Sequence, residues 1–354
     1  MNLFSELELR SVKLRNRIAI SPMCQYSSEN GLPNEWHVVH LGQFALGGAA
    51  LVFTEANAIT PQGRISPEDL GIYSNEHVKA FKPITKFIKD HGAVPGTQLA
   101  HAGRKASTYR PWAPKHGEIK LKDGGWTTIS SSPEAFSDTY PTPHELTISE
   151  IQGVLEDWKT AAKRAIESGF EILEIHAAHG YLLHQFYSPL SNHRTDKYGG
   201  SFENRIRLTC EVVAAVRSVV PQDFPLMVRI SCTDWMEGGW TIEDSVKLAR
   251  ELKKLGVDLI DASSGGNIAL AKIPVGPGYQ VEFAQKIKHR ADILTGAVGM
   301  ITDPHQADTI IRTGQADLVL LAREMLRDPY WPSLAAKELG APHDFVPKQY
   351  ARAW

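Results

Sequence analysis

The sequence predicts an α/β fold, a (β/α)8 TIM barrel formed as a single domain by residues 1–354. Short apolar runs of strand length recur along the chain, each followed by a longer stretch with helical spacing, which is typical of parallel strands joined by crossover helices. Most runs lack the polar–apolar alternation of a half-exposed sheet, as expected for strands covered on both faces. Eight such units favour a closed barrel, since an open doubly wound sheet normally uses fewer strands. The open sheet is the alternative.

The individual elements follow from this alternation. The expected strands span residues 17–23, 50–56, 94–101, 170–177, 226–231, 259–263, 293–297 and 318–322. Expected helices include residues 149–168, 204–220, 241–255, 303–313 and 329–339. Ser149 and Thr241 supply capping side chains at two helix starts, and Gly169, Gly256 and Gly314 lie where helices should end. We also expect an N-terminal β-hairpin that caps the barrel.

Residues 103–143 interrupt the alternation. The segment is rich in Pro, Gly, Ser and Lys, shows no periodicity and follows the third expected strand. We therefore expect a long loop insertion on the C-terminal face of the barrel. Loops of this length are often lids or substrate contacts, and a loose surface insertion is the alternative.

Composition excludes several classes of partner. The chain is 42% hydrophobic and 22% charged with a formal charge of −2, which describes a soluble globular protein and argues against nucleic acid as the main partner. No apolar run is long enough to cross a bilayer, and the N-terminus lacks an export signal, so we expect no membrane partner and a cytoplasmic protein. Cys24, Cys210 and Cys232 are too few and too scattered for a disulfide framework.

Polar side chains gather where the expected strands end. Active sites of such barrels form at the C-terminal strand ends, so many polar residues on one rim are difficult to explain by packing alone. The residues concerned are Cys24, Gln25, Tyr26, Glu55, Gln98, His101, His176, His179, Tyr181, Arg229, Ser263 and Arg323.

The last two expected strands indicate a phosphate site. Gly296 and Gly299 let backbone N–H groups approach an anion, and Arg323 can add a two-pronged contact. Barrels commonly bind phosphate after strands seven and eight. No dinucleotide fingerprint is present, so the phosphate looks like that of a mononucleotide-type cofactor.

The segment from Glu174 to Leu182 carries the most chemistry. His176 and His179 can both donate to one carbonyl oxygen if the chain turns between them, and Tyr181 can supply a proton. A metal pair, completed by His101 or Glu55, is one alternative. Two core histidines bonded to the backbone are the other.

Six motifs follow one another along nearly the whole chain: SPMCQY at 21–26, HAGRK at 101–105, HAAHGYL at 176–182, SNHRTDKYGGS at 191–201, GAVGM at 296–300 and QYARAW at 349–354. Together and in this order they resemble the motifs of Old Yellow Enzymes. Cys24 and the tail point to the YqjM-like or xenobiotic reductase branch. Ala322 and Ala353 depart from that pattern, where glycine is expected.

The resemblance implies one FMN-binding barrel domain, with FMN bound non-covalently. Gln98 would bind the pyrimidine ring and Arg229 the N1 and C2-carbonyl edge, while Cys24 would tune the flavin potential. The positions that match FMN contacts are Ser21, Pro22, Met23, Cys24, Ala56, Gln98, Arg229, Gly299 and Arg323.

The resemblance also implies an NAD(P)H-dependent ene-reductase that reduces the C=C bond of α,β-unsaturated carbonyl or nitro compounds by a ping-pong hydride transfer. The catalytic residues would be Tyr181, His176, His179 and Cys24, and the substrate-binding residues Tyr26, His176, His179 and Arg352. No metal is expected. A metal-dependent hydrolase or lyase and a non-catalytic flavin-binding protein are the alternatives.

The C-terminal tail, residues 340–354, carries a further expectation. In the resembled branch an arginine of the tail enters the neighbouring subunit's active site, and Arg352 matches it. This implies a homodimer or homotetramer with shared sites. A frayed tail is the usual fate of terminal residues and is the alternative.

Overall fold

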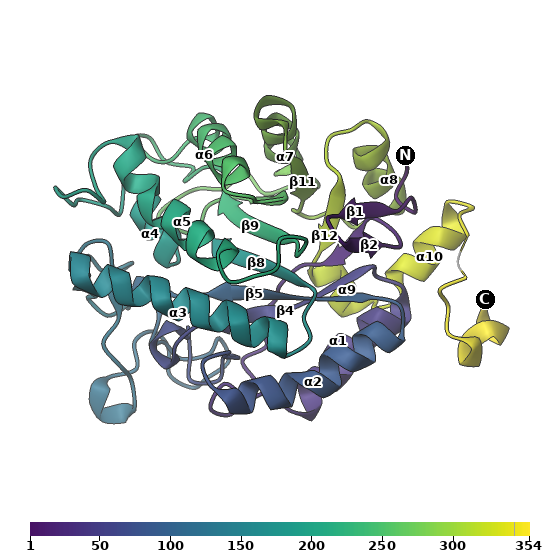
Figure 1. The fold of residues 1–354 in the computed structure, drawn as a ribbon, viewed down its shortest axis with the longest axis horizontal. Coiled ribbons are helices and arrows are strands. Elements are labelled where there is room, and N and C mark those ends of the chain that lie inside the picture. Colours follow the sequence, from purple (N-terminus) through teal and green to yellow (C-terminus); the bar gives the residue numbers. More distant parts are fainter. Residues whose placement is uncertain (343) are drawn as a thin grey trace.

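The computed structural model describes residues 1–342 and 344–354, and within them eight parallel strands close into a barrel (Figure 1). The neighbours run in the order β10-β11-β12-β3-β4-β5-β8-β9 around the barrel. The predicted (β/α)8 barrel is therefore confirmed, and the open sheet is wrong. The strands are β3 (Ile18–Ile20), β4 (Leu51–Ala58), β5 (Val94–Ala100), β8 (Ile172–Ala177), β9 (Leu226–Ser231), β10 (Leu259–Ser263), β11 (Leu294–Ala297) and β12 (Leu318–Leu321).

The helices surround the strands on the outside of the barrel (Figure 1). They are α1 (Glu35–Gly47), α2 (Asn75–Asp90), α3 (Ile148–Glu167), α4 (Leu182–Tyr187), α5 (Phe202–Arg217), α6 (Ile242–Lys254), α7 (Val281–Ile287), α8 (Pro304–Arg312), α9 (Arg323–Arg327) and α10 (Trp331–Glu338). All five predicted helices are present within a few residues of the expected bounds. Across the described residues, none of the helices combines the length and apolarity needed to span a membrane.

Two boundaries differ from the prediction for identifiable reasons. Thr147, rather than Ser149, caps α3, because its hydroxyl accepts from the Glu150 N–H while the Glu150 carboxylate accepts from the Thr147 N–H. Strand β3 ends at Ile20 instead of residue 23, since Pro22 has no N–H to donate to a neighbouring strand. Cys24 therefore lies in the loop beyond β3.

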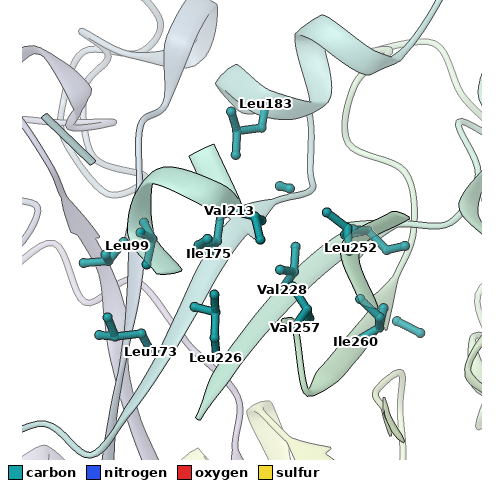
Figure 2. Packing of buried hydrophobic residues seen from close by; sticks show 14 of the residues in the cluster. Leu99, Leu173, Ile175, Leu183, Val213, Leu226, Val228, Leu252, Val257 and Ile260 are labelled. Atoms are coloured by element: carbon teal, nitrogen blue, oxygen red, sulfur yellow. The ribbon is translucent and has the colours of Figure 1, made fainter. Parts of the chain in front are cut away.

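The core has two parts, outside and inside the barrel. Leu173, Ile175 and Val228 point outward from β8 and β9 and pack among helix residues such as Val213 and Leu252 (Figure 2). Inside the barrel, a second apolar cluster fills the N-terminal end. The two faces of each strand are buried, which explains the absence of polar alternation in the sequence.

The hairpin of β1 (Leu7–Leu9) and β2 (Val12–Leu14) closes the N-terminal end of the barrel. Leu7, Leu9 and Leu14 belong to the inner cluster, together with Phe53 and Ile172 from the barrel strands. The expected hairpin cap is thus confirmed. With this end filled by apolar side chains, polar residues further along the strands gather at the opposite end.

The insertion 103–143 packs on the C-terminal end of the barrel. It contains the short helices η2 (Gly103–Lys105) and η3 (Leu121–Asp123) and strand β6 (Ile129–Ser130), which pairs with β7 (His144–Glu145). Arg104 donates to the Asn267 carbonyl at 2.8 Å, and the Ser131 hydroxyl donates to the Gln185 carbonyl at 2.8 Å. These buried bonds tie the segment to α4 and to the loop after β10, so a loose surface insertion is wrong.

Candidate active site

The residues at the end of β8 form a compact group. His176 lies on the inner face of β8, and the chain then turns through two left-handed residues, His179 at φ 58° and Gly180 at φ 73°. The turn directs the side chains of His179 and Tyr181 back toward His176. The His176 ring centroid is 5.1 Å from that of His179 and 4.9 Å from that of Tyr181. The structure therefore brings together the three side chains that the motif predicted to act together.

Hydrogen bonds and burial define the state of the two imidazoles. His176 Nδ1 accepts from the Ala178 N–H at 3.2 Å, and His179 Nε2 lies 2.6 Å from the Ser263 hydroxyl. Burial, reinforced by the Arg229 guanidinium, holds the pKa of both rings well below the usual histidine value. Neutral His176 with an accepting Nδ1 carries its proton on Nε2. It is therefore a neutral donor.

Three side chains that the sequence reasoning missed hold this turn in place. His184 Nδ1 accepts from the Gly180 N–H at 2.9 Å, and its Nε2 lies 2.8 Å from Asp234 Oδ1. Gln185 Nε2 donates to the Gly180 carbonyl at 2.7 Å. The HGYLLHQ run could have indicated His184 and Gln185, since both lie on α4, about one helical turn after Gly180; no sequence signal pointed to Asp234.

Two pairs of side chains on neighbouring strands, Arg229 with Asp261 and Gln98 with Glu174, bring charged and polar groups together inside the barrel. These four side chains are called the barrel floor. Arg229 Nε lies 3.1 Å from Asp261 Oδ2, and Arg229 Nη1 donates to the Ser21 hydroxyl at 3.1 Å. Gln98 Nε2 donates to Glu174 Oε1 at 2.7 Å. Burial, with Asp261 nearby, raises the pKa of Glu174 to about 8. Glu174 and Asp261 were not predicted to have a role, but they orient the predicted Gln98 and Arg229.

A cavity of about 330 Å³ opens beside this floor. Arg323 at one side of it has no ion pair or side-chain hydrogen bond within residues 1–342 and 344–354, so its guanidinium is available to an anion. Gly299, whose φ is 125°, lines the cavity with its backbone. A Cβ there would meet Gln280 Nε2 at 3.0 Å, so the position favours glycine. The lining includes His179, Arg229, Ser263, Tyr279, Gly299, Ala322 and Arg323.

These features fit a mononucleotide such as FMN. A free guanidinium next to a glycine backbone suits a phosphate, and the cavity also reaches the cationic Arg229 and the His179 ring. When bound there, FMN would be held by Gly299 and Arg323 at the phosphate and by Arg229 and Gln98 at the ring. Ala322, where glycine was expected, is part of the cavity wall.

The remaining predicted residues lie near the first and second barrel strands. Ser21, Pro22, Met23 and Cys24 follow β3, and Ala56 on β4 pairs with Gln98 on β5. Burial, with the Asp69 and Glu55 carboxylates, raises the pKa of the Cys24 thiol well above its usual value.

Tyr26 follows this loop in a left-handed conformation at φ 48°. Its ring is 5.8 Å from that of Trp112 in the insertion, in an edge-to-face arrangement. The insertion therefore contacts one of the predicted substrate-binding residues. Its role as a lid stays a prediction.

The metal alternative lacks a ligand set. Glu55 instead accepts from the Gln25 N–H at 3.0 Å and lies 3.3 Å from His37 Nε2, while His101 Nδ1 accepts from the Gly103 N–H. In the described part of the chain, no group of three or more His, Cys, Asp or Glu side chains could hold a metal ion.

Arg352 lies apart from this group in its own chain. It is exposed on the short helix η5 (Lys348–Ala353), in the C-terminal segment that extends beyond α10, away from the barrel (Figure 1). It does not line the cavity next to Arg229. Any contribution of Arg352 to an active site would therefore be to another subunit's.

Comparison with known proteins places nearly the whole chain in one family. The model of the NADH:flavin oxidoreductase / NADH oxidase family matches residues 2–341. An NADPH dehydrogenase of Geobacillus sp. (strain WCH70) is 49% identical over 354 residues, 99% of this chain and 98% of that protein. An NADPH dehydrogenase of Bacillus subtilis (strain 168) is 45% identical over 354 residues, 99% of each chain.

A solved structure extends the comparison to the arrangement of the barrel. Morphinone reductase in complex with tetrahydroNAD is 25% identical, covers 99% of this chain and 93% of its own, and superposes with a TM-score of 0.79. The chain therefore belongs to the NADH:flavin oxidoreductase / NADH oxidase family, as its resemblance to Old Yellow Enzymes predicted, and is an FMN-dependent NAD(P)H oxidoreductase.

Proposed function

We propose that the protein is an ene-reductase, which uses NAD(P)H to reduce the C=C bond of α,β-unsaturated carbonyl compounds. The observation that carries the proposal is the grouping of neutral His176 and His179 with Tyr181 beside a cavity floored by Arg229. Nitro compounds present oxygens that the same donors could bind and are included as acceptors. The reductant and the acceptor would use the same pocket in turn, which is a ping-pong mechanism.

The two histidines would bind the acceptor's carbonyl oxygen. His176 would donate through Nε2, and His179, in the tautomer with its proton on Nε2, would donate once that N–H turns from Ser263 to the bound oxygen. Neutral donors suit this step, because the oxygen gains negative charge only as hydride arrives at the β-carbon. The hydrogen bonds therefore strengthen in the transition state more than in the bound substrate.

Tyr181 would protonate the α-carbon. Burial, with Cys24 and Tyr26 nearby, raises the pKa of its hydroxyl well above the usual tyrosine value, so it keeps its proton across the working pH range. An enolate formed by hydride addition is basic enough to take that proton. Tyr26 would line the acceptor's other side.

FMN, when bound, supplies the hydride and takes one from NAD(P)H. The chain's contribution is to orient and stabilise it: Gln98 is held by Glu174, and Arg229 is held by Asp261 and Ser21. A cationic guanidinium at the ring favours the electron-rich reduced form. We further propose that Arg352 completes the site of a neighbouring subunit in a homodimer or homotetramer.

An anaerobic absorption titration tests the proposal. The purified protein should show flavin absorption, lose it on addition of NADPH or NADH, and regain it when 2-cyclohexen-1-one is added without oxygen. Parallel lines in double-reciprocal plots would support the shared pocket. A flavin that NADPH reduces but no enone or nitro acceptor reoxidises would contradict the proposal, and a flavin that neither reagent changes would indicate a non-catalytic flavin-binding protein.

A further inference from the structure

Lys105 lies next to Tyr181, and backbone carbonyls hold its ammonium. Its Nζ donates to the His179 carbonyl and to the Gly266 carbonyl, both at 2.9 Å. No carboxylate of residues 1–342 or 344–354 lies within ion-pair distance of it. An ammonium held by two neutral carbonyls keeps its positive charge uncompensated. The local environment therefore favours any group nearby that becomes negative.

Tyr181 is a group close to Lys105 that becomes negative during the proposed alkene reduction. Lys105 Nζ is 5.2 Å from the centroid of the Tyr181 ring and 4.5 Å from that of Phe136. A cation at this distance interacts favourably with a neutral phenol ring and more strongly with a phenolate, because the phenolate carries a full negative charge. The Phe136 ring makes a second cation–π contact with the same ammonium.

We propose that Lys105 is a positioning residue for the protonation step: its ammonium fixes the His179 carbonyl and stabilises the phenolate that Tyr181 becomes. This inference rests on the proposed ene-reductase function. In the step, the Tyr181 O–H bond breaks, a C–H bond forms at the α-carbon of the enolate, and the electron pair stays on the phenolate oxygen. Water returns the proton to the phenolate afterwards.

The charge on Lys105 gives this step a pH dependence. Burial, with the Arg104 guanidinium nearby, lowers the pKa of the Lys105 ammonium to about 8. The charge is therefore present below that pH and lost as pH rises through it. The other titratable or charged groups that face Lys105 or Tyr181 are Arg104, His176, His179, His184, Cys24, Tyr26, Tyr140 and Asp69.

Asp69 needs separate treatment, because burial and Glu55 raise its pKa to about 8 as well. An Asp69 carboxylate raises the pKa of the Tyr181 hydroxyl and would also slow protonation at high pH. The contribution of Asp69 persists in any Lys105 variant, whereas that of Lys105 does not. A comparison of variants at position 105 therefore separates the two.

The experiment compares wild type with Lys105→Met and Lys105→Arg by stopped flow, from about pH 6 to pH 9.5, following flavin reoxidation by 2-cyclohexen-1-one. Lys105→Met should slow reoxidation about tenfold near neutral pH and flatten the fall above pH 8. Lys105→Arg, which stays charged, should recover most of the rate and show a shallower fall than wild type. Exposed Lys122 in the same insertion supplies the matched control, Lys122→Met.

Three outcomes would overturn the inference. Reoxidation by Lys105→Met could match wild type at every pH, the fall above pH 8 could persist unchanged in both variants, or only flavin reduction by NADPH could slow, which would make Lys105 a contact for the nicotinamide. If wild type itself fails to reduce the enone, the proposed function fails instead, and this is visible before any variant is compared. Bound FMN and the thermal midpoint identify a variant that has misfolded, in which case Lys105→Gln replaces Lys105→Met.

Discussion

The two ends of the barrel are built from the same strands but from different side chains. At the N-terminal end, Ile172 of β8 packs with Phe53 and the hairpin leucines in an apolar cluster. Two and four residues later on the same face of β8, Glu174 and His176 lie among charged and polar groups. Position along the barrel axis thus decides whether an inward side chain contributes mainly to stability or to chemistry. Substitutions at the two ends should separate these properties.

The largest effect on stability is expected at the apolar end. Phe53 is 1% exposed and sits inside the barrel. Phe53→Ala should lower the free energy of unfolding by about 3–5 kcal/mol, because it leaves a cavity in a closed space. Denaturant unfolding measures this, and activity per bound FMN should change little. The milder Phe53→Leu is the control, and a large loss of activity without a loss of stability would contradict the division between the ends.

At the polar end, substitutions should reduce activity more than stability. His176→Ala should slow enone reduction by about 100- to 1000-fold, the cost of removing one donor to a developing oxyanion. Phenolic ligands, which present an oxygen to the same donors, should bind more weakly in spectral titrations. The free energy of unfolding should fall by only about 1 kcal/mol, since one hydrogen bond to the Ala178 N–H is lost. Unchanged ligand binding and unchanged enone reduction would refute the role of His176.

Substitution of Asp234 should affect both stability and activity, because Asp234 positions the Gly180 turn through His184. Its Oδ1 faces His184 Nε2, and its Oδ2 accepts from the Ser188 hydroxyl at 2.6 Å and the Trp240 N–H at 2.8 Å. Asp234→Asn places an amide N–H where one of these groups must donate. We expect a loss of about 1–3 kcal/mol of stability together with an approximately tenfold slower enone reduction, as the Gly180 turn loosens.

Exposed Glu237 in the same loop provides the control, Glu237→Gln. Stopped-flow reoxidation and urea unfolding on the same samples give both quantities for each variant. Loss of stability alone would show that the His184–Asp234 pair supports the loop without affecting the position of Tyr181.

The fold could be predicted well because each strand is apolar on both faces and each helix has its own end signals. Thr241 and Gly256 bracket α6 as predicted, since a capping hydroxyl and a left-handed glycine are local properties. The end of β3 could not be read from apolarity alone, because Ser21, Pro22 and Met23 continue the run but Pro22 cannot extend the ladder. Helices α1 and α2 were not among the predicted helices, although each begins with a capping box.

The grouping of His176, His179 and Tyr181 was predictable because one short segment carries all three side chains. The supporting residues were not, because they come from distant parts of the chain. Asp234 reaches His184 across 50 positions and Lys105 reaches His179 across 74. Such pairs leave no spacing pattern in a single sequence. The barrel closure creates them, so they emerge only once strands from the whole chain are placed around one axis.

The smallest effect on enone reduction is expected at Arg352, in the exposed tail far from the barrel floor. If the tail completes a neighbouring site, Arg352→Ala should raise the KM for the enone by about threefold, a modest loss typical of an exposed charged contact. Lys348→Ala, on the same short helix, is the control. Dilution of wild type sharpens the test, because dissociation of the oligomer should raise its KM to that of the variant. A KM that stays constant while sedimentation shows the oligomer dissociating would mean that each barrel completes its own site, and that the polar end of one subunit needs nothing from the next.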